Sequence, residues 1–328
     1  MTDSNYERYS WLDILKGFGI IFVVLGHFCS INAVYNWAYS FHMPLFFLAS
    51  GYLYHKKSVI GTVKHKFLTL MVPYFLFGII TSIYYVLISF MISREVNFGE
   101  LIFGLMYGTY SRIVYNKELW FLPSLFCISV IYNMLKSGMG EQKLLYALVA
   151  TITVLSMLEV VPDILPWGMD YHVCLFMIYY MLGNILAEKG WIEKVRKLPV
   201  KYKCIWVLVL ICGHSLIFTY HSLSRPLGYI IALIGIAEWI FISILIENHG
   251  KILEYIGQAS LCILCLHIPV EEVLNIILVR ITNMTVESRS LELKYVLVRC
   301  VLTIFLCLIC NYVIMRFFPR MLGRKTSG

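Results

Sequence analysis

Charged side chains are scarce in this sequence: they make up 14% of its 328 residues, against roughly a quarter in ordinary soluble proteins. Hydrophobic residues make up 60%. A soluble domain of this length needs a charged surface to stay dispersed, and 27 Lys and Arg with 19 Asp and Glu are too few to provide one. The shortage of charge excludes a soluble enzyme, a secreted disulfide scaffold and a disordered chain, and it predicts a polytopic membrane protein.

Long polar linkers, internal repeats and low-complexity tracts are also missing, so we expect one integral-membrane domain over residues 1–328. The first apolar segment carries Asp13 and Lys16 and lacks the clean apolar middle of a signal peptide, which predicts a retained helix. The ten cysteines lie in or beside apolar stretches, where free Cys behaves as a small hydrophobe. Two cysteine pairs have CxxC spacing, but their apolar neighbours lack the polar partners that support metal ligands, and we expect no metal site.

Ten apolar segments are long enough to cross a bilayer as helices, which takes about 20 mostly apolar residues. We therefore predict an all-α polytopic membrane helix bundle of about ten transmembrane helices. The linker 93–117 contains a shorter apolar run at 98–107, for which we predict an interfacial hairpin on the outer side. The ten predicted spans lie at about 11–30, 37–54, 67–92, 118–136, 144–161, 171–188, 204–221, 226–246, 257–279 and 293–315.

Lys and Arg predict the orientation of these spans, because they gather on the cytoplasmic side of membrane proteins. Placing the N-terminus inside puts most of the 27 basic residues in cytoplasmic connections, including clusters at 56–66 and 189–203. We therefore expect both termini to be cytoplasmic, which an even number of spans satisfies. The net charge of +8 reflects this topology and does not indicate a nucleic-acid partner.

The first span contains three ionisable residues, Asp13, Lys16 and His27. Such groups cost several kcal/mol inside a membrane unless they are paired or face an aqueous cavity. At 100° per residue, Lys16 and His27 lie within about 20° of each other, and Asp13 lies within about 40° of His27, with about 16 Å between Lys16 and His27 along the helix. This polar stripe predicts a catalytic function for the three residues. The alternative is an interfacial i,i+3 ion pair of Asp13 and Lys16, with His27 at the outer helix end.

Four further residues are candidates for binding a substrate on the outer side. The loop after the first span is short, so His42 should lie near His27. His267 lies seven residues after Ser260 and nearly on the same helix face, and Trp120 opens the fourth span. We interpret His42, Trp120, Ser260 and His267 as the walls of a shared polar cavity. The alternatives are a turn contact for His42, an aromatic-belt position for Trp120 and a purely structural role for His267.

Basic residues after the second span form a candidate anion site on the cytoplasmic side. Lys64 and Lys66 could bind the phosphates of a cytoplasmic donor, since ammonium groups bind phosphate. Ordinary enrichment of basic residues in cytoplasmic loops is the alternative. Four other ionisable residues within the predicted spans are Glu159, His172 and His214, which we treat as interfacial, and Glu238, to which we assign no role.

Several short motifs recur in a fixed order across the ten predicted spans. Lys16 and His27 form a basic residue, ten spacers and a histidine. Later segments are Phe41-His42-Met-Pro-Leu-Phe-Phe, Ser50-Gly51, Pro73-Tyr74, Leu119-Trp120-Phe-Leu-Pro123 and Ser260 to His267. Over essentially the whole chain this set resembles the membrane-bound acyltransferase 3 family, and within it the fucose 4-O-acetylase-like branch. That family usually has arginine where this chain has Lys16, a change common in the branch, and Lys64 or Lys66 would replace a second family arginine.

The resemblance implies transfer of an acyl group, with acetyl as the first choice, from cytoplasmic acyl-CoA to a hydroxyl of a cell-surface polysaccharide or lipid-linked glycan. His27 would be the general base or a transient acyl carrier. A neutral imidazole suits this role, since it can deprotonate a sugar hydroxyl that attacks a thioester while a nearby carboxylate orients it. Lys16 could bind a phosphate of the donor or polarise the carbonyl.

The resemblance also sets expectations for ligands and location. Acetyl-CoA would be a co-substrate, with no bound cofactor, and the other partners would be an envelope glycan and the lipid bilayer. The expected location is the bacterial cytoplasmic (inner) membrane, with several passes, and self-association into a homo-oligomer stays open. A transporter or exporter that uses the same polar stripe is the alternative function. Broken helices in matching positions of two halves would favour transport, and the sequence has no such symmetry.

Overall fold

The computed structural model describes residues 9–158, 160–218, 225–282 and 292–323. Every regular element within these ranges is a helix, which confirms the all-α polytopic bundle. A helix lies at each of the ten predicted spans. These helices are α1 (Ser10–Phe28), α2 (Asn32–Tyr52), α4 (Val72–Met91), α6 (Phe121–Gly138), α7 (Gln142–Met157), α8 (Tyr171–Glu188), α10 (Val200–Phe218), α11 (Arg225–Leu245), α13 (Ser260–Thr282) and α15 (Leu293–Phe317).

Seven helical segments of the described chain are long and apolar enough to cross a membrane. They include α1, α4 with the helix before it, α6 with the turn before it, α10, α11, α13 and α15. The remaining predicted spans, at α2, α7 and α8, are helices of 21, 16 and 18 residues. The count of ten crossings and the cytoplasmic position of both termini stay predictions.

Four shorter helices lie in the connections: α3 (Val59–Lys66), α5 (Phe98–Tyr107), α9 (Trp191–Lys197) and α12 (Lys251–Gln258). The predicted hairpin at 98–107 is instead the single helix α5, and the prediction of a hairpin was wrong. Asn97 caps its start by accepting a hydrogen bond from the Glu100 N–H at 3.2 Å, and Gly108 ends it in the left-handed conformation with φ of 71°. The ninth span begins at Ser260, because Ala259 separates it from α12.

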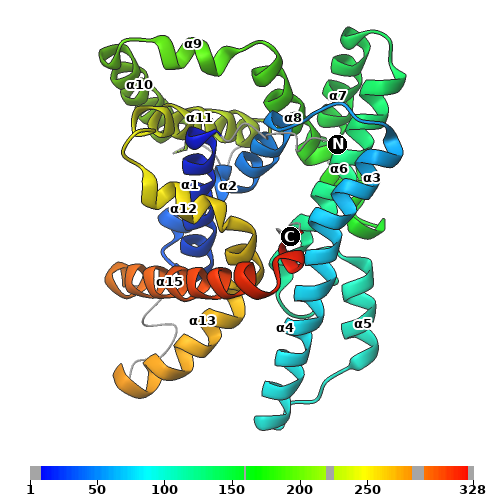
Figure 1. Cartoon of the computed structure of the whole chain (residues 1–328), viewed down its shortest axis with the longest axis vertical. Coiled ribbons are helices and arrows are strands. Elements are labelled where there is room, and N and C mark those ends of the chain that lie inside the picture. The colour runs from blue at the N-terminus through cyan, green and yellow to red at the C-terminus, as the bar shows by residue number, and fades with distance from the viewer. Residues whose placement is uncertain (1–8, 159, 219–224, 283–291, 324–328) are drawn as a thin grey trace.

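Helix α1 lies at the centre of the bundle and packs against α2, α11, α12, α13 and α15 (Figure 1). Its contact with α12 is a close approach of backbones. A Cβ added at Gly17 would lie 2.2 Å from the Leu253 carbonyl oxygen, and one added at Gly257 would lie 1.8 Å from that of Asp13. Small residues permit this packing between membrane helices. The helix that carries the predicted polar stripe is therefore enclosed by protein.

Helix α2 connects this centre to a second group of helices, because it packs against α1, α8 and α11. Helices α4 and α5 lie side by side at the edge of the molecule (Figure 1). Proline occurs inside two of the central helices, at Pro44 in α2 and Pro269 in α13. A proline has no N–H to donate to the carbonyl four residues earlier, so these positions release one backbone acceptor each for other contacts.

Candidate active site

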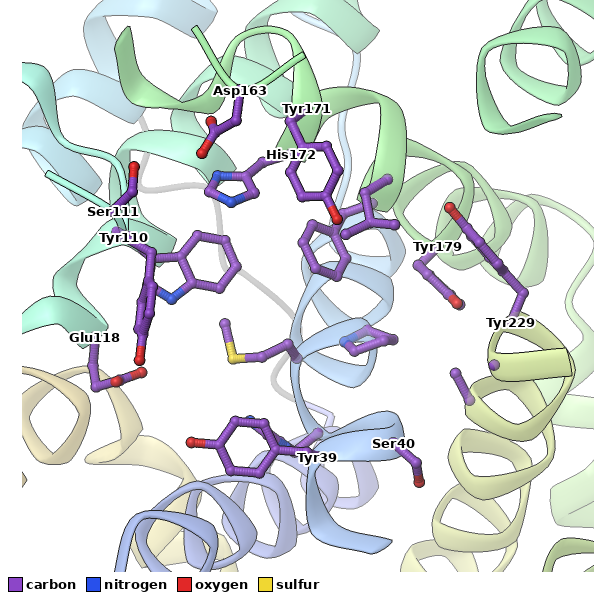
Figure 2. A pocket seen from close by; sticks show the side chains of 18 residues that line it. Tyr39, Ser40, Tyr110, Ser111, Glu118, Asp163, Tyr171, His172, Tyr179 and Tyr229 are labelled. Carbon is purple, nitrogen blue, oxygen red and sulfur yellow. The ribbon is translucent and has the colours of Figure 1, made fainter. Parts of the chain in front are cut away.

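A cavity of about 900 Å³ lies between α2, α8, α11 and the segments before α6 and α8 (Figure 2). Figure 2 shows Glu118, Tyr110 and Tyr39 toward one end, Tyr179 and Tyr229 at the other, and Asp163, Tyr171 and His172 along a third side. Its size is that of a cleft for a small organic ligand. Two of the predicted substrate-binding residues, His42 and Trp120, line it.

His27 sits behind one wall of this cavity and is held by two residues that line it. Its Nε2 lies 3.1 Å from the Glu118 carboxylate, and its Nδ1 lies 3.0 Å from the Tyr39 hydroxyl. An ionised carboxylate can only accept, so Nε2 carries the proton. The Tyr39 hydroxyl then donates to Nδ1, whose lone pair is directed toward the cavity side. The basic Nδ1 of His27 thus contacts the cavity through the hydroxyl of Tyr39, which lines it.

The turn that carries Glu118 is fixed to α13 by a side chain. Asn116 has the left-handed backbone conformation, with φ of 53°, which Asn tolerates better than most residues. A short 3-10 helix (Lys117–Trp120) follows it. The Asn116 Nδ2 donates to the Cys265 carbonyl oxygen at 2.8 Å, and that carbonyl is available because Pro269 cannot donate to it. The proline in α13 thus creates the acceptor that positions Glu118.

Two other predicted histidines pack around His27. The His267 ring lies 5.3 Å from the His27 ring, centroid to centroid. The His42 ring lies 4.8 Å from the Tyr39 ring that bonds to His27. His267 is fully buried, and its Nδ1 donates to the Ile263 and Leu264 carbonyls at 3.0 and 2.9 Å. His42 therefore lies near His27 as predicted, whereas His267, predicted as a cavity wall, packs on His27 and is not part of the lining.

His172, which the sequence led us to treat as interfacial, is buried in the cavity wall. Its ring packs 4.3 Å from the Trp120 ring, and its Nδ1 lies 2.9 Å from the Ser124 hydroxyl. The sequence did not reveal this position, because His172 lies next to the start of α8. Asp170 caps α8 by accepting from the Tyr171 N–H at 2.8 Å, and His172, the residue after Tyr171, lies in the cavity wall.

Two neighbouring carboxylates shape the electrostatics around Asp163, which lines the cavity. Burial and the neighbouring Asp170 raise the pKa of Asp163. Burial acts to raise the pKa of Asp170 as well, but hydrogen bonds from the backbone N–H groups of Ile164 and Leu165 and of Tyr171 hold it below its ordinary value. Burial and Glu118 raise the pKa of Tyr110, which keeps that phenol protonated. The cavity lining therefore combines carboxylate acceptors with phenolic hydroxyls.

A comparison with protein families decides the class of this site. A family model, Acyl_transf_3, described as an acyltransferase domain, matches residues 9–315. The chain belongs to the acyltransferase 3 family. No curated protein and no solved structure matches it. The protein is thus a multi-pass membrane acyltransferase, and its assignment to the fucose 4-O-acetylase-like branch stays a prediction.

The remaining predicted catalytic residues of this acyltransferase lie away from His27. Lys16 Nζ lies 2.5 Å from the Asp13 carboxylate, which is the i,i+3 ion pair that we considered. Eleven residues of α1, about 16 Å, separate Lys16 from His27. The structure therefore brings Asp13 and Lys16 to each other but not to His27, whose carboxylate partner is Glu118. Their assignment as catalytic residues stays a prediction.

Ser260 and the two predicted phosphate-binding lysines also lie outside the large cavity of the acyltransferase. Ser260 begins α13, about two turns from His267, and does not belong to the cavity lining. Lys66 lines a small pocket of about 30 Å³ at the other end of α2 and α8, together with Lys57 and His65. Lys64 is exposed on α3. A basic cluster therefore exists at the predicted cytoplasmic end, with Lys66 as its inward member.

His214 and Glu238 form a second buried pair, with His214 Nδ1 2.9 Å from the Glu238 carboxylate. His214, which we also treated as interfacial, is buried in this pair, and Glu238, to which we assigned no role, has a partner. Glu159 lies outside the described residues. The carboxylates that follow His267 have other partners: Glu271 pairs with Arg299, and Glu272 accepts from the Tyr115 hydroxyl at 2.7 Å.

Sequence reasoning missed the two residues that hold His27 in the acyltransferase, Glu118 and Tyr39. A signal for Glu118 was available, because it is a carboxylate directly before an apolar span and two residues from Trp120. Tyr39 gave no such signal among 23 tyrosines. Its position three residues before His42 becomes informative only when both residues are placed on the same face of α2.

Proposed function

We propose that this acyltransferase transfers an acyl group, acetyl as first choice, from cytoplasmic acyl-CoA to a hydroxyl of a cell-surface polysaccharide or lipid-linked glycan. The observation that carries the proposal is the pairing of His27 with Glu118 and Tyr39 at the wall of the large cavity. Family membership supports acyl transfer, and this geometry supports a histidine that accepts a proton from the cavity side.

In the proposed reaction, His27 acts as a general base through Nδ1. The acceptor hydroxyl attacks the thioester carbonyl carbon of acyl-CoA, and its proton passes to Nδ1, directly or through the Tyr39 hydroxyl. The carbon–sulfur bond then breaks, the ester forms on the acceptor, and the proton on His27 passes to the departing thiolate, which gives free CoA. Glu118 stabilises the transient imidazolium and fixes its tautomer.

The donor is proposed to enter from the opposite end of α1. Lys16 lies about 16 Å from His27 along the helix axis, a separation that the extended pantetheine arm of CoA suits. Lys66, with Lys57 and His65 beside it, is the proposed contact for donor phosphates, because ammonium groups attract phosphate oxygens. The proposed setting is the bacterial cytoplasmic membrane, with the cavity toward its outer side.

The test is a transfer assay in membrane vesicles that contain the protein. Radiolabelled acetyl-CoA and glycan from the host are supplied, and free CoA thiol and labelled, base-labile ester are both measured. We expect the two products in equal amounts with the wild-type chain and neither with His27→Gln. Acetyl-CoA consumption without ester, or glycan movement without CoA release, would contradict the proposal, and the second result would favour the transporter.

A separate prediction concerns Lys16, the proposed contact for the acyl-CoA donor. Lys16→Ala should raise KM for acetyl-CoA about tenfold with a smaller change in kcat, because a lost contact to a charged donor group is worth about 1–2 kcal/mol. Lys16→Arg is the matched control, since it retains the charge and should remain close to the wild type. If Lys16→Ala leaves the dependence on acetyl-CoA unaltered, Lys16 serves only in its ion pair with Asp13.

A further inference from the structure

The large cavity has an unusual selection of polar groups, which suggests the chemistry of its ligand. Its lining contains two carboxylates, Glu118 and Asp163, but no Lys or Arg from any of the described residues. An anionic group bound there would be placed beside two carboxylates with no positive partner in the lining. Arg112 acts on Asp163 and the Lys117 ammonium lies 5.4 Å from the Tyr110 ring, but neither cation lines the cavity. Taking an unpaired charge out of water costs several kcal/mol, so such a ligand is disfavoured.

Hydrogen bonds fix the protonation of the two histidines in the lining. A backbone carbonyl can only accept, so the 2.6 Å contact between His42 Nδ1 and the Ala38 oxygen places the proton on Nδ1. In the neutral imidazole, Nε2 is then an acceptor. His42 therefore offers the cavity a lone pair rather than an N–H.

His172 has the same tautomer for a different reason. The Ser124 hydroxyl lies 3.3 Å from the Trp167 carbonyl oxygen and 2.9 Å from His172 Nδ1. Ser124 has one proton, which it donates to the carbonyl, so it accepts the Nδ1 proton of His172. The Nε2 of His172 is left as an acceptor as well. Two carboxylates and two imidazole nitrogens thus provide acceptors beside the tyrosine and serine hydroxyls of the lining, and a ligand that brings both donors and acceptors satisfies them.

Aromatic rings form much of the rest of the lining. Trp120 packs on His172 and lies 5.8 Å from the Phe176 ring, and Tyr179 stacks on Tyr229 at 5.8 Å. The negative faces of such rings attract the weakly positive C–H groups of a sugar ring. A neutral sugar supplies both features, namely C–H faces for the aromatic rings and several O–H donors for the acceptors.

We propose that this cavity selects an uncharged, hydroxyl-rich sugar as the acyl acceptor, with His42 and His172 accepting hydrogen bonds from its hydroxyls through Nε2. This proposal rests on the acyl transfer proposed above and narrows its acceptor from glycans in general to neutral ones. Sugars with a carboxylate or phosphate near the reacting hydroxyl are rejected by Glu118 and Asp163.

The test compares two probes that differ only in charge. One is the neutral repeating-unit oligosaccharide prepared from the host's envelope glycan, and the other is the same oligosaccharide after oxidation of its primary alcohols to carboxylates. Binding to the full-length protein in lipid nanodiscs is measured by calorimetry, without an acyl donor. We expect the oxidised probe to bind at least tenfold more weakly. Equal binding, tighter binding of the oxidised probe, or binding of neither overturns the proposal.

Variants of the lining make the test specific. His172→Phe keeps a ring against Trp120 but removes the acceptor, and should weaken binding of the neutral probe about tenfold, the effect of one hydrogen bond. Leu175→Lys adds a cation to the lining and should reduce the preference for the neutral probe at least threefold, whereas Leu175→Gln, of similar length and uncharged, should retain it. If Leu175→Lys and Leu175→Gln show the same preference, charge does not control selection.

This binding experiment separates the inference from the proposed reaction. Because no donor is present, binding and its charge preference are measured whether or not transfer occurs. Charge-selective binding without ester formation in the vesicle assay contradicts the acyl transfer to glycan but leaves the ligand class intact. Ester formation on a host glycan, combined with binding that ignores charge, contradicts the ligand class alone.

Discussion

Two histidine–glutamate pairs in this acyltransferase, one half-buried and one buried, have nearly the same internal geometry and different surroundings. His27 lies 3.1 Å from Glu118, and His214 lies 2.9 Å from Glu238. Glu118 lines the large cavity, and the second nitrogen of His27 is bonded to Tyr39, which lines it too. The first pair is thus connected to a space that a ligand can enter.

The second pair is enclosed by aromatic rings. The His214 ring packs 6.2 Å from Trp37 and 5.7 Å from Phe41, and its Nε2 is buried with no hydrogen-bonding partner among the residues that the structure describes. His214 is also one of two buried side chains of α10, the other being Lys203. The pair therefore attaches an otherwise lipid-facing helix to α11. The two pairs therefore differ in access to a cavity rather than in the pairing itself, and on this difference we expect His27 to react and His214 to be structural.

The largest expected effect comes from removing the two histidines by the same substitution. His27→Gln should lower kcat/KM about 10³-fold, within the usual range for loss of a general base. His214→Gln should leave activity per folded molecule within about threefold, because a glutamine amide can still donate to Glu238 and the pair does not line the cavity. Transfer rates are normalised to folded protein by size-exclusion chromatography in detergent. Comparable loss of normalised activity in both variants would remove the distinction between the pairs.

The next effect concerns the carboxylates. Glu118→Gln keeps a similar shape but loses the charge, and its amide can donate to Nε2 and move the histidine proton to Nδ1. We expect kcat to fall about 10²-fold, with KM for acetyl-CoA nearly unchanged. Glu238→Gln should leave kcat near the wild-type value. A fall in KM alone, or equal values of kcat in the two variants, would contradict the role of Glu118.

The fold was largely predictable because its main signal is composition. Each of the ten predicted apolar segments coincides with a helix, since a long apolar run has few alternatives in a membrane. The wrong predictions concern the ends of helices, where capping and packing decide the structure. The segment 98–107 is a helix because Asn97 caps it and Gly108 ends it. The break between α12 and α13 at Ala259 follows from packing of α12 on α1, which no local pattern records.

The site was predictable only in part. His27, His42, Trp120 and His267 were identified because polar groups in apolar helices are conspicuous, and they do converge. Glu118 was not assigned to His27, since the contact joins residues 91 positions apart and depends on the bond from Asn116 to α13. Such contacts come from tertiary packing, which spacing along one helix cannot predict.

A smaller fall in kcat is expected when the contact between His27 and the cavity lining is removed. The His214 pair has no such contact. Tyr39→Phe removes the hydroxyl that donates to Nδ1 and should lower kcat about tenfold, the effect of one hydrogen bond. Tyr85→Phe is the matched control, because Tyr85 stacks on Tyr115 at 5.2 Å, away from His27, and does not line the cavity. It should change kcat less than twofold. Equal effects in the two variants would show that Tyr39 only supports packing.

The smallest effect on activity, and the most direct test of the second pair, is its replacement by apolar residues. His214→Phe alone should cost about 3 kcal/mol, because it removes the donor and leaves the buried Glu238 carboxylate unpaired. The double variant His214→Phe with Glu238→Leu removes both polar groups and should regain most of that stability, with kcat within about twofold of the wild type. Thermal unfolding in detergent and the transfer assay measure the two quantities. A stable but inactive double variant would mean that the pair takes part in the reaction. Apolar side chains can hold α10 against α11, but they cannot carry a proton.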